Sequence, residues 1–150
     1  AKQLARQMHG RTVVVYGASF LSAVARRWKT QINENAKGWA FSESLPELNH
    51  NSVVGYSHPP DAPRYVCLAM LTSPLLSERI RLRYAVTEEL LRQAGVEPQV
   101  VSGQGRYPLS QMMSLVLLGD YASFYLALLN GVDPYPVPAV DYLKRRLSQG

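Results

Sequence analysis

A polar stretch at residues 31–51 contains the side chains of this sequence that are best suited to transferring a proton. It reads QINENAKGWAFSESLPELNHN and includes three glutamates and one histidine. A carboxylate with a nearby histidine is the minimum set for moving a proton between adjacent carbons of a sugar. One base takes the proton from C2 and returns it to C1, while a second group helps to open the ring. The residues concerned are Glu34, Glu43, Glu47 and His50.

A purely structural interpretation of the same stretch also has to be kept. Polar segments rich in asparagine are common in loops and helix caps. Glu34 could pair with Lys29 or Lys37 at the end of a helix, and His50 could be a capped loop histidine. From the residue types alone, both interpretations stay open.

Other kinds of chemistry find little support in the sequence. The turn at residues 17–19 lacks the further glycines of a dinucleotide-binding G-x-G-x-x-G motif, and no P-loop is present. We therefore expect no cofactor. Cys67 lies in the apolar run RYVCLAML and is expected to fill the core. The three histidines share no ligand spacing, so no metal site is expected; they are His9, His50 and His58.

Charge and composition limit the kinds of partner. The chain has 150 residues and a net charge of +5, which favours anionic partners. Its basic residues are not interleaved with aromatic side chains, so we expect solvated helix faces and no nucleic-acid binding. No signal peptide or lipidation motif is visible, which favours a cytoplasmic location. The chain begins at Ala1 rather than at a methionine, which is compatible with a piece of a longer polypeptide.

Strand patterns alternate with helix patterns along the chain. Short β-branched or apolar runs predict strands at residues 12–17, 64–71 and 98–103, and the alternating segment GWAFSES predicts a short strand at residues 38–44. Apolar residues at helical spacing predict helices at residues 2–9, 19–33, 73–95, 108–130 and 139–147. This order predicts a single α/β domain over residues 1–150, a flavodoxin-like three-layer α-β-α sandwich with a mostly parallel sheet. Ligands of such folds bind beyond the carboxyl ends of the strands, where the strand order switches.

Two of the predicted helices have expected starting residues. Ser19 is a candidate N-cap for the helix after the first strand. Ser73 and Pro74 are expected to open a later helix that stops at Gly95. The apolar positions of that later helix include Leu82, Val86 and Leu90.

The predicted helix at residues 108–130 is apolar on almost every side. Asp120, Gln111 and three serines interrupt it, and an aspartate at the middle of a bilayer would cost about 2.5–3.5 kcal/mol. We therefore expect no membrane span, but a helix buried in the domain or at a subunit interface. Because such a helix needs cover on more than one side, a dimer is expected.

The residue order now adds a family resemblance. The strings W-K-T-Q-I-N-E-N-A-K and F-x-x-x-x-P-E-L-N-H-N, the helix RLRYAVTEELL, and the ending G-V-D-P-x-P-V-x-x-x-D-Y-L-K stand in this order from residue 28 to residue 144. Together they resemble the carboxy-terminal SIS (sugar isomerase) domain of bifunctional phosphoglucose/phosphomannose isomerases. The resemblance implies a phosphosugar substrate, with glucose 6-phosphate and mannose 6-phosphate converted to and from fructose 6-phosphate. It also implies an amino-terminal SIS domain in the same polypeptide and a homodimer.

The resemblance assigns roles to three residues. Glu34 matches the proton-shuttling base, and His50 matches a histidine that assists ring opening in the active site of the neighbouring subunit. Lys144 matches a lysine that holds the ring oxygen and the substrate hydroxyls, although it could also be a solvated cation beside Arg145 and Arg146. Ser52 departs from the family pattern, in which an acidic residue often follows the histidine and asparagine.

The phosphate-binding segment of the family is missing from this chain. The serine- and threonine-rich loop that holds the phosphate lies in the first SIS domain, and no S-x-S-G-x-T-like stretch occurs in this chain. The alternative function is therefore a non-catalytic SIS domain that binds a phosphosugar. We expect Glu43, Glu47 and His58 to be structural or surface residues.

Overall fold

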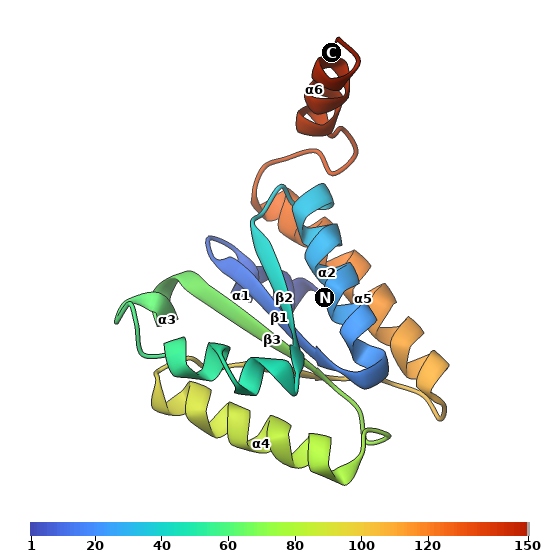
Figure 1. The fold of residues 1–150 in the computed structure, drawn as a ribbon. Helices are drawn as coiled ribbons and strands as arrows, with labels where there is room; N and C mark the ends of the chain where they lie inside the picture. Colours follow the sequence, from blue (N-terminus) through green and yellow to red (C-terminus); the bar gives the residue numbers. More distant parts are fainter. Residues whose placement is uncertain (150) are drawn as a thin grey trace.

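A parallel four-stranded sheet forms the centre of the molecule in the computed structural model, which describes residues 1–149 (Figure 1). The spatial order of the strands is β2-β1-β3-β4. Their bounds are β1 Thr12–Ala18, β2 Ala40–Leu45, β3 Val66–Thr72 and β4 Gln99–Ser102. All three neighbouring pairs are parallel, which confirms the predicted α/β class.

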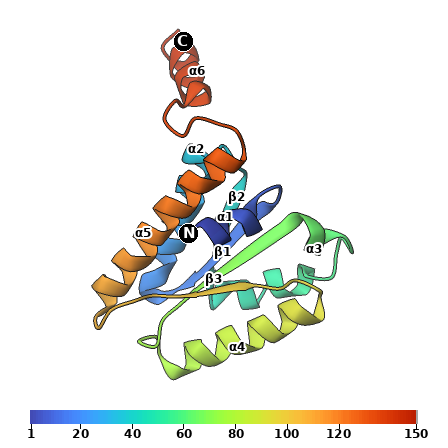
Figure 2. The same cartoon turned by 180° about the vertical axis from the view of Figure 1, so that it is seen from behind.

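Helices cover both faces of this sheet, as Figures 1 and 2 show. One face carries α1 Lys2–Met8, α2 Ser22–Asn35 and α5 Pro108–Leu129. The other face carries η2 Glu47–Asn49, η3 Ser52–Gly55 and α4 Glu78–Gln93. Three shorter or outlying elements complete the fold, namely η1 Ser19–Leu21, α3 Ala62–Tyr65 and α6 Pro138–Leu147. The predicted three-layer arrangement is confirmed.

The two central strands make the core of the domain. Since helices pack on both sides of them, nearly every side chain of β1 and β3 is buried, and their sequences are correspondingly apolar. Cys67 lies on β3 and is buried, as predicted. Burial raises the pKa of its thiol, with a smaller opposing effect from Arg11, so this cysteine is an unreactive core residue.

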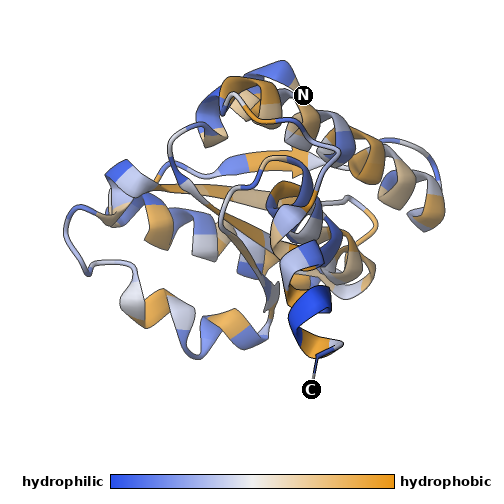
Figure 3. Cartoon of the chain, turned by 90° about the horizontal axis from the view of Figure 1, so that it is seen from above, coloured by the Kyte–Doolittle hydropathy of each residue, from blue (hydrophilic) through white to orange (hydrophobic). Residues whose placement is uncertain are grey.

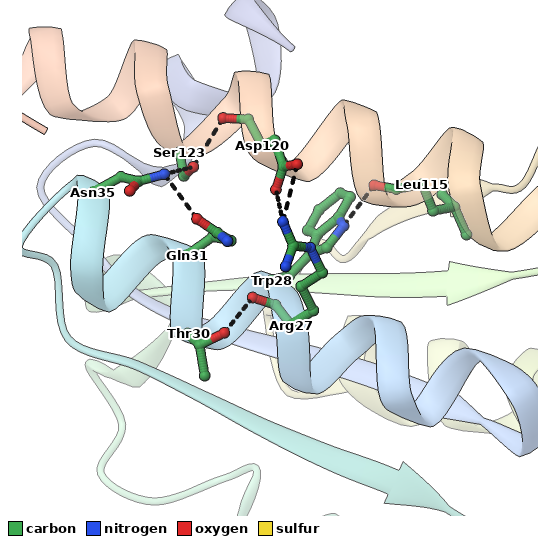
Figure 4. A network of polar contacts seen from close by, with 8 residues as sticks. All are labelled: Arg27, Trp28, Thr30, Gln31, Asn35, Leu115, Asp120 and Ser123. Atoms are coloured by element: carbon green, nitrogen blue, oxygen red, sulfur yellow. Dashed lines mark hydrogen bonds and ion pairs between the residues drawn. The ribbon is translucent and has the colours of Figure 1, made fainter. Parts of the chain in front are cut away.

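The helices α2 and α5 pack unusually closely against each other (Figure 4). The indole nitrogen of buried Trp28 donates a 2.7 Å hydrogen bond to the backbone oxygen of Leu115. Gly119 makes this approach possible, because a Cβ at that position would overlap Nε1 of Trp28. At the rim of the contact, Arg27 forms a 3.1 Å ion pair with Asp120.

Gly119→Ala is expected to destabilise the domain strongly. The added methyl would overlap the buried indole, which is held by its bond to Leu115 and has no free side toward which it could move. Overpacking of this kind costs about 1–3 kcal/mol or more. The free energy of unfolding in urea measures the effect, with Gly55→Ala as the matched control, because a Cβ at Gly55 meets no neighbouring atom and its φ is not positive. Equal stability of Gly119→Ala and the wild type would show that the helices can separate freely.

Several predicted element boundaries were wrong. Ser19 does not cap α2, because it begins the short turn η1 with a φ of 53°, and α2 starts at Ser22. The later helix begins after Ser77, whose Oγ accepts a bond from the amide of Ile80, so Ser73 and Pro74 lie outside it. The strand predicted at 64–71 was placed to begin two residues too early, because residues 64 and 65 close α3 and β3 begins at Val66.

The buried face of α4 also differs from the prediction. The helix turns Tyr84, Thr87 and Leu91 toward the sheet, and the hydroxyl of Tyr84 donates to the backbone oxygen of Leu71. The apolar positions named from the sequence, Leu82, Val86 and Leu90, are exposed. They line an open groove between α4 and η3.

The last helix, α6, stands clear of the rest of the domain (Figures 1 and 2). None of its residues is buried, although one side carries Val140, Leu143 and Leu147. Figure 3 shows this mixture of hydrophilic and hydrophobic residues near the carboxyl terminus. Isolated helices of ten residues are marginal in water, so α6 is expected to need a docking surface.

Candidate active site

Glu34 lies in the last turn of α2, and its side chain is exposed. The asparagines on either side of it are both anchored. Asn33 Nδ2 donates a 2.8 Å bond to the backbone oxygen of Gly38. Asn35 Nδ2 donates 2.9 Å bonds to Gln31 and to Ser123 of α5 (Figure 4). Among residues 1–149 no hydrogen bond or ion pair engages the Glu34 carboxylate, so the motif fixes the backbone and leaves the acid free.

Lys37 connects the end of α2 to the segment that precedes α6. Its Nζ donates to the backbone oxygen of Glu34 at 2.5 Å and to that of Pro134 at 3.1 Å. Lys37 therefore contacts the peptide of Glu34 and forms no ion pair with the carboxylate. The contact places the start of the α6 linker beside Glu34.

An open hollow of about 580 Å³ lies next to this turn. One wall of it is formed by Lys29 and Asn33, one helical turn apart on α2, and by Lys37, which follows the end of that helix. The rings of Trp39 and Phe41 form another wall, with centroids 5.2 Å apart. The two lysines make the hollow cationic, which suits an anionic ligand.

His50 repeats the pattern seen around Glu34. It follows η2, in which Leu48 is buried, and its own side chain is exposed. The preceding Asn49 is anchored to α4, because its Nδ2 donates to Thr87 Oγ1 at 2.9 Å and its Oδ1 accepts from Arg83 at 3.1 Å. In both motifs an anchored asparagine precedes a titratable side chain that remains free.

Glu34 and His50 lie at opposite ends of the parallel strands, namely at the amino edge and the carboxyl edge of the sheet. Glu34 ends α2 just before β2 begins, which is the amino edge of the strands. His50 lies after β2 ends, at the carboxyl edge. The six residues of β2 separate these edges by about 17 Å. One chain therefore does not bring the two side chains together, and Glu34 is not at the carboxyl edge where ligands were expected.

Lys144 is exposed in the last turn of α6. The Lys37–Pro134 contact puts the α6 linker at the same edge of the sheet as Glu34. The helix itself extends away from that edge (Figure 1). The structure thus places the linker to α6 near Glu34 without bringing Lys144 itself to Glu34.

A polar cluster formed by Tyr16, Glu43, Ser52 and Tyr56 was not recognised from the sequence. Ser52 Oγ donates to the Glu43 carboxylate, so an acidic residue at position 52 would face a like charge. The hydroxyls of Tyr16 and Tyr56 are 3.1 Å apart, and burial raises the pKa of both. Both phenols therefore stay protonated and act as structural groups. Glu43 takes part in the same cluster through its bond from Ser52, which agrees with the structural role expected for it. The alternating sequence of β2 was the available signal that Glu43 lies on one face of the sheet.

No three His, Cys, Asp or Glu side chains within residues 1–149 come together in a way that could hold a metal ion.

Comparison with known proteins identifies the family. Residues 1–147 match the family described as the bacterial phospho-glucose isomerase C-terminal SIS domain. The chain belongs to this family. The SIS domain is 37% identical over 148 residues to the bifunctional phosphoglucose/phosphomannose isomerase of Aquifex aeolicus, covering 99% of this chain and 46% of that protein. The enzyme of the same name from Caldicellulosiruptor bescii is 35% identical, with 99% and 44% covered. The SIS domain thus spans slightly less than half the length of these curated relatives.

Solved structures share the fold of this SIS domain. A glucose-6-phosphate isomerase like protein from Thermus thermophilus superimposes with a TM-score of 0.73 at 23% identity, covering 89% of this chain and 44% of that one. The C-terminal domain of glucosamine-fructose-6-phosphate aminotransferase from Francisella tularensis gives a TM-score of 0.72 at 11% identity, with 88% and 40% covered. At these identities the likeness shows the architecture alone.

Proposed function

We propose that this SIS domain is the catalytic carboxy-terminal half of an aldose–ketose isomerase that interconverts glucose 6-phosphate, and also mannose 6-phosphate, with fructose 6-phosphate. The observation that carries the proposal is the free carboxylate of Glu34, set between two anchored asparagines in a chain of this family. The names of the curated relatives support the choice of substrates.

In the proposed reaction Glu34 takes the proton from C2 of the open-chain aldose. The electron pair left on C2 forms the C1–C2 double bond while the C1=O π pair moves to O1, which gives an enediol(ate). One proton passes from O2 to O1, and Glu34 returns its proton to C1 as the C2=O bond forms, which gives the ketose. Exposure of the carboxylate at the end of α2 allows it to reach both carbons in turn. The reaction is redox-neutral within the sugar and needs no cofactor.

Two further groups complete the proposed site. His50 of a neighbouring subunit assists ring opening by proton transfer at the ring and C1 oxygens, which agrees with its separation from Glu34 within one chain. Lys144 binds the ring oxygen and hydroxyls once α6 docks at the Glu34 edge. An amino-terminal SIS domain, in the layout of the relatives, supplies the phosphate-binding loop. We place the enzyme in the cytoplasm, where the Cys67 thiol of this chain stays reduced.

Turnover of fructose 6-phosphate in D2O by the full polypeptide tests the proposal. As the group that holds the abstracted proton, the carboxylic acid of Glu34 exchanges it with solvent during the lifetime of the enediol(ate). Both glucose 6-phosphate and mannose 6-phosphate should therefore carry deuterium at C2, as measured by proton NMR. Turnover with no deuterium incorporated would indicate a hydride shift and contradict the assignment of a carboxylate base.

One observation favours a second candidate, a phosphosugar-binding domain without catalysis. The chain offers a cationic hollow with aromatic walls, while its acid and its histidine lie at opposite edges. A binding domain of this kind would retain fructose 6-phosphate in equilibrium dialysis, yet the full polypeptide would show neither turnover nor deuterium exchange.

A further inference from the structure

The loop that carries His50 is fixed both by the core and by side chains of α4. Leu48, two residues before His50, is 1% exposed and belongs to the core. Asn49 is bonded to α4 through both ends of its amide, to Thr87 and to Arg83. His50 itself is exposed. The backbone before the histidine is therefore held, while its ring is left free.

Three hydrogen bonds around the Asn49 amide form a closed ring with a defined direction. The Thr87 hydroxyl donates to the backbone oxygen of Arg83 at 2.7 Å, so its proton is already used within α4. The same hydroxyl oxygen accepts from Nδ2 of Asn49 at 2.9 Å. At the other end of the amide, Oδ1 accepts from the Arg83 guanidinium at 3.1 Å. An amide, with a donor at one end and an acceptor at the other, satisfies this ring in one orientation.

Burial and charge both strengthen this contact. Thr87 is 1% exposed, so loss of its hydroxyl would leave the Nδ2 group of Asn49 without a partner in a place that water does not reach freely. Arg83 is partly buried, and among residues 1–149 no carboxylate pairs with it. Its charge therefore serves the amide oxygen, and such charge-assisted bonds are about twice as strong as neutral ones.

We propose that Thr87 and Arg83 are positioning residues for the isomerase reaction, because they hold the backbone from which His50 reaches the sugar ring in the neighbouring subunit. This inference rests on the proposed function. Neither side chain touches the substrate, and both act through Asn49. Proton transfer requires a heavy-atom distance of about 2.6–3.2 Å, and a misplacement of about 1 Å costs roughly 100-fold in rate. A histidine on an unanchored loop would meet that distance only rarely.

A comparison of single and double variants of the full polypeptide separates positioning from a general structural role. Thr87→Val removes the accepting oxygen and should lower kcat for fructose 6-phosphate about 10- to 100-fold with KM nearly unchanged. Thr87→Ser keeps the hydroxyl and should restore most of that loss. In a His50→Ala background, Thr87→Val should lower the residual kcat no further, because the side chain that it positions is absent. Equal losses in both backgrounds would overturn the proposal.

A matched pair of arginine variants tests the second bond. Arg79 lies one helical turn before Arg83, lines the same groove of α4, and is not the arginine that bonds Asn49. Arg83→Met should lower kcat about tenfold, whereas Arg79→Met should leave it within a factor of about two. Equal losses for the two variants would assign the effect to the charge of the groove and contradict a positioning role for Arg83.

Hydrogen exchange of the full polypeptide, followed by mass spectrometry, measures the loop without reference to catalysis. The backbone amides of Asn49 and His50 donate within their turn at 3.0 Å and 2.9 Å. Thr87→Val and Arg83→Met should speed exchange of these amides at least about tenfold, while Arg79→Met should not. Circular dichroism checks that all variants are folded.

The exchange rates also distinguish failure of this inference from failure of the proposed function. Unchanged exchange in Thr87→Val and Arg83→Met would overturn the inference, because the loop would not depend on α4. Faster exchange combined with full activity of His50→Ala would instead refute the proposed function, and the positioning role with it, because the reaction would not use this histidine.

Discussion

Glu34→Gln is expected to abolish almost all isomerase activity of the full polypeptide while substrate affinity remains nearly unchanged. Glutamine has the same shape and keeps the hydrogen bonds of the neighbouring asparagines, but its amide does not take up the C2 proton. Loss of the single base that serves both transfers lowers kcat by about 10³–10⁴-fold. The measurement is kcat and KM for fructose 6-phosphate in a coupled assay.

Glu47→Gln provides the matched control for this change. Glu47 is another exposed glutamate of the same polar stretch, and its carboxylate accepts a long 3.5 Å bond from Asn51. It has no proposed role in proton transfer, so its substitution should leave kcat within a factor of about two. Activity that survives Glu34→Gln would refute the catalytic assignment. A loss of affinity without a loss of kcat would assign Glu34 to binding instead.

The isolated 150-residue chain should be a very poor isomerase compared with the full polypeptide. Binding energy from the remote phosphate positions the reacting carbons in a phosphosugar enzyme, and this chain lacks the phosphate-binding loop. Its α6 also stands away from Glu34, so Lys144 is not held in place. We expect kcat/KM for fructose 6-phosphate to be at least about 10³-fold lower.

The activity comparison also requires a check that the isolated chain is folded. A cooperative thermal transition in circular dichroism would show that low activity does not result from unfolding. Robust turnover by the isolated chain would contradict the prediction, since it would mean that residues 1–150 contain a complete active site.

The layers of the fold could be predicted because they depend on local patterns. The β-branched run of β1 and the apolar run of β3 are signals for strands buried on both faces, and the order of elements then leaves few topologies. The first residues of the helices near Ser19 and Ser77 were predicted less accurately. Several serines compete as caps, and the choice depends on how each helix packs on the sheet.

The candidate site was predictable only in part, for a related reason. The family resemblance pointed to Glu34, His50 and Lys144 and assigned His50 to a neighbouring subunit, but it did not indicate the contacts that anchor the residues around them. The bond from Asn35 to Ser123 joins residues 88 positions apart, and nothing in either segment alone indicates it. The exposed position of Leu82 was missed because the amphipathic pattern of α4 does not say which of two apolar sides packs on the sheet.

The central claim is that each active site combines Glu34 of one subunit with His50 of another, and mixed dimers test it most directly. Full polypeptides carrying Glu34→Gln or His50→Ala should each be nearly inactive alone. Co-expressed, they form hybrid dimers in which one site has both native residues, so about a quarter of the wild-type activity should return. If the mixture stays as inactive as its components, His50 does not serve the neighbouring subunit and the account of the site is wrong.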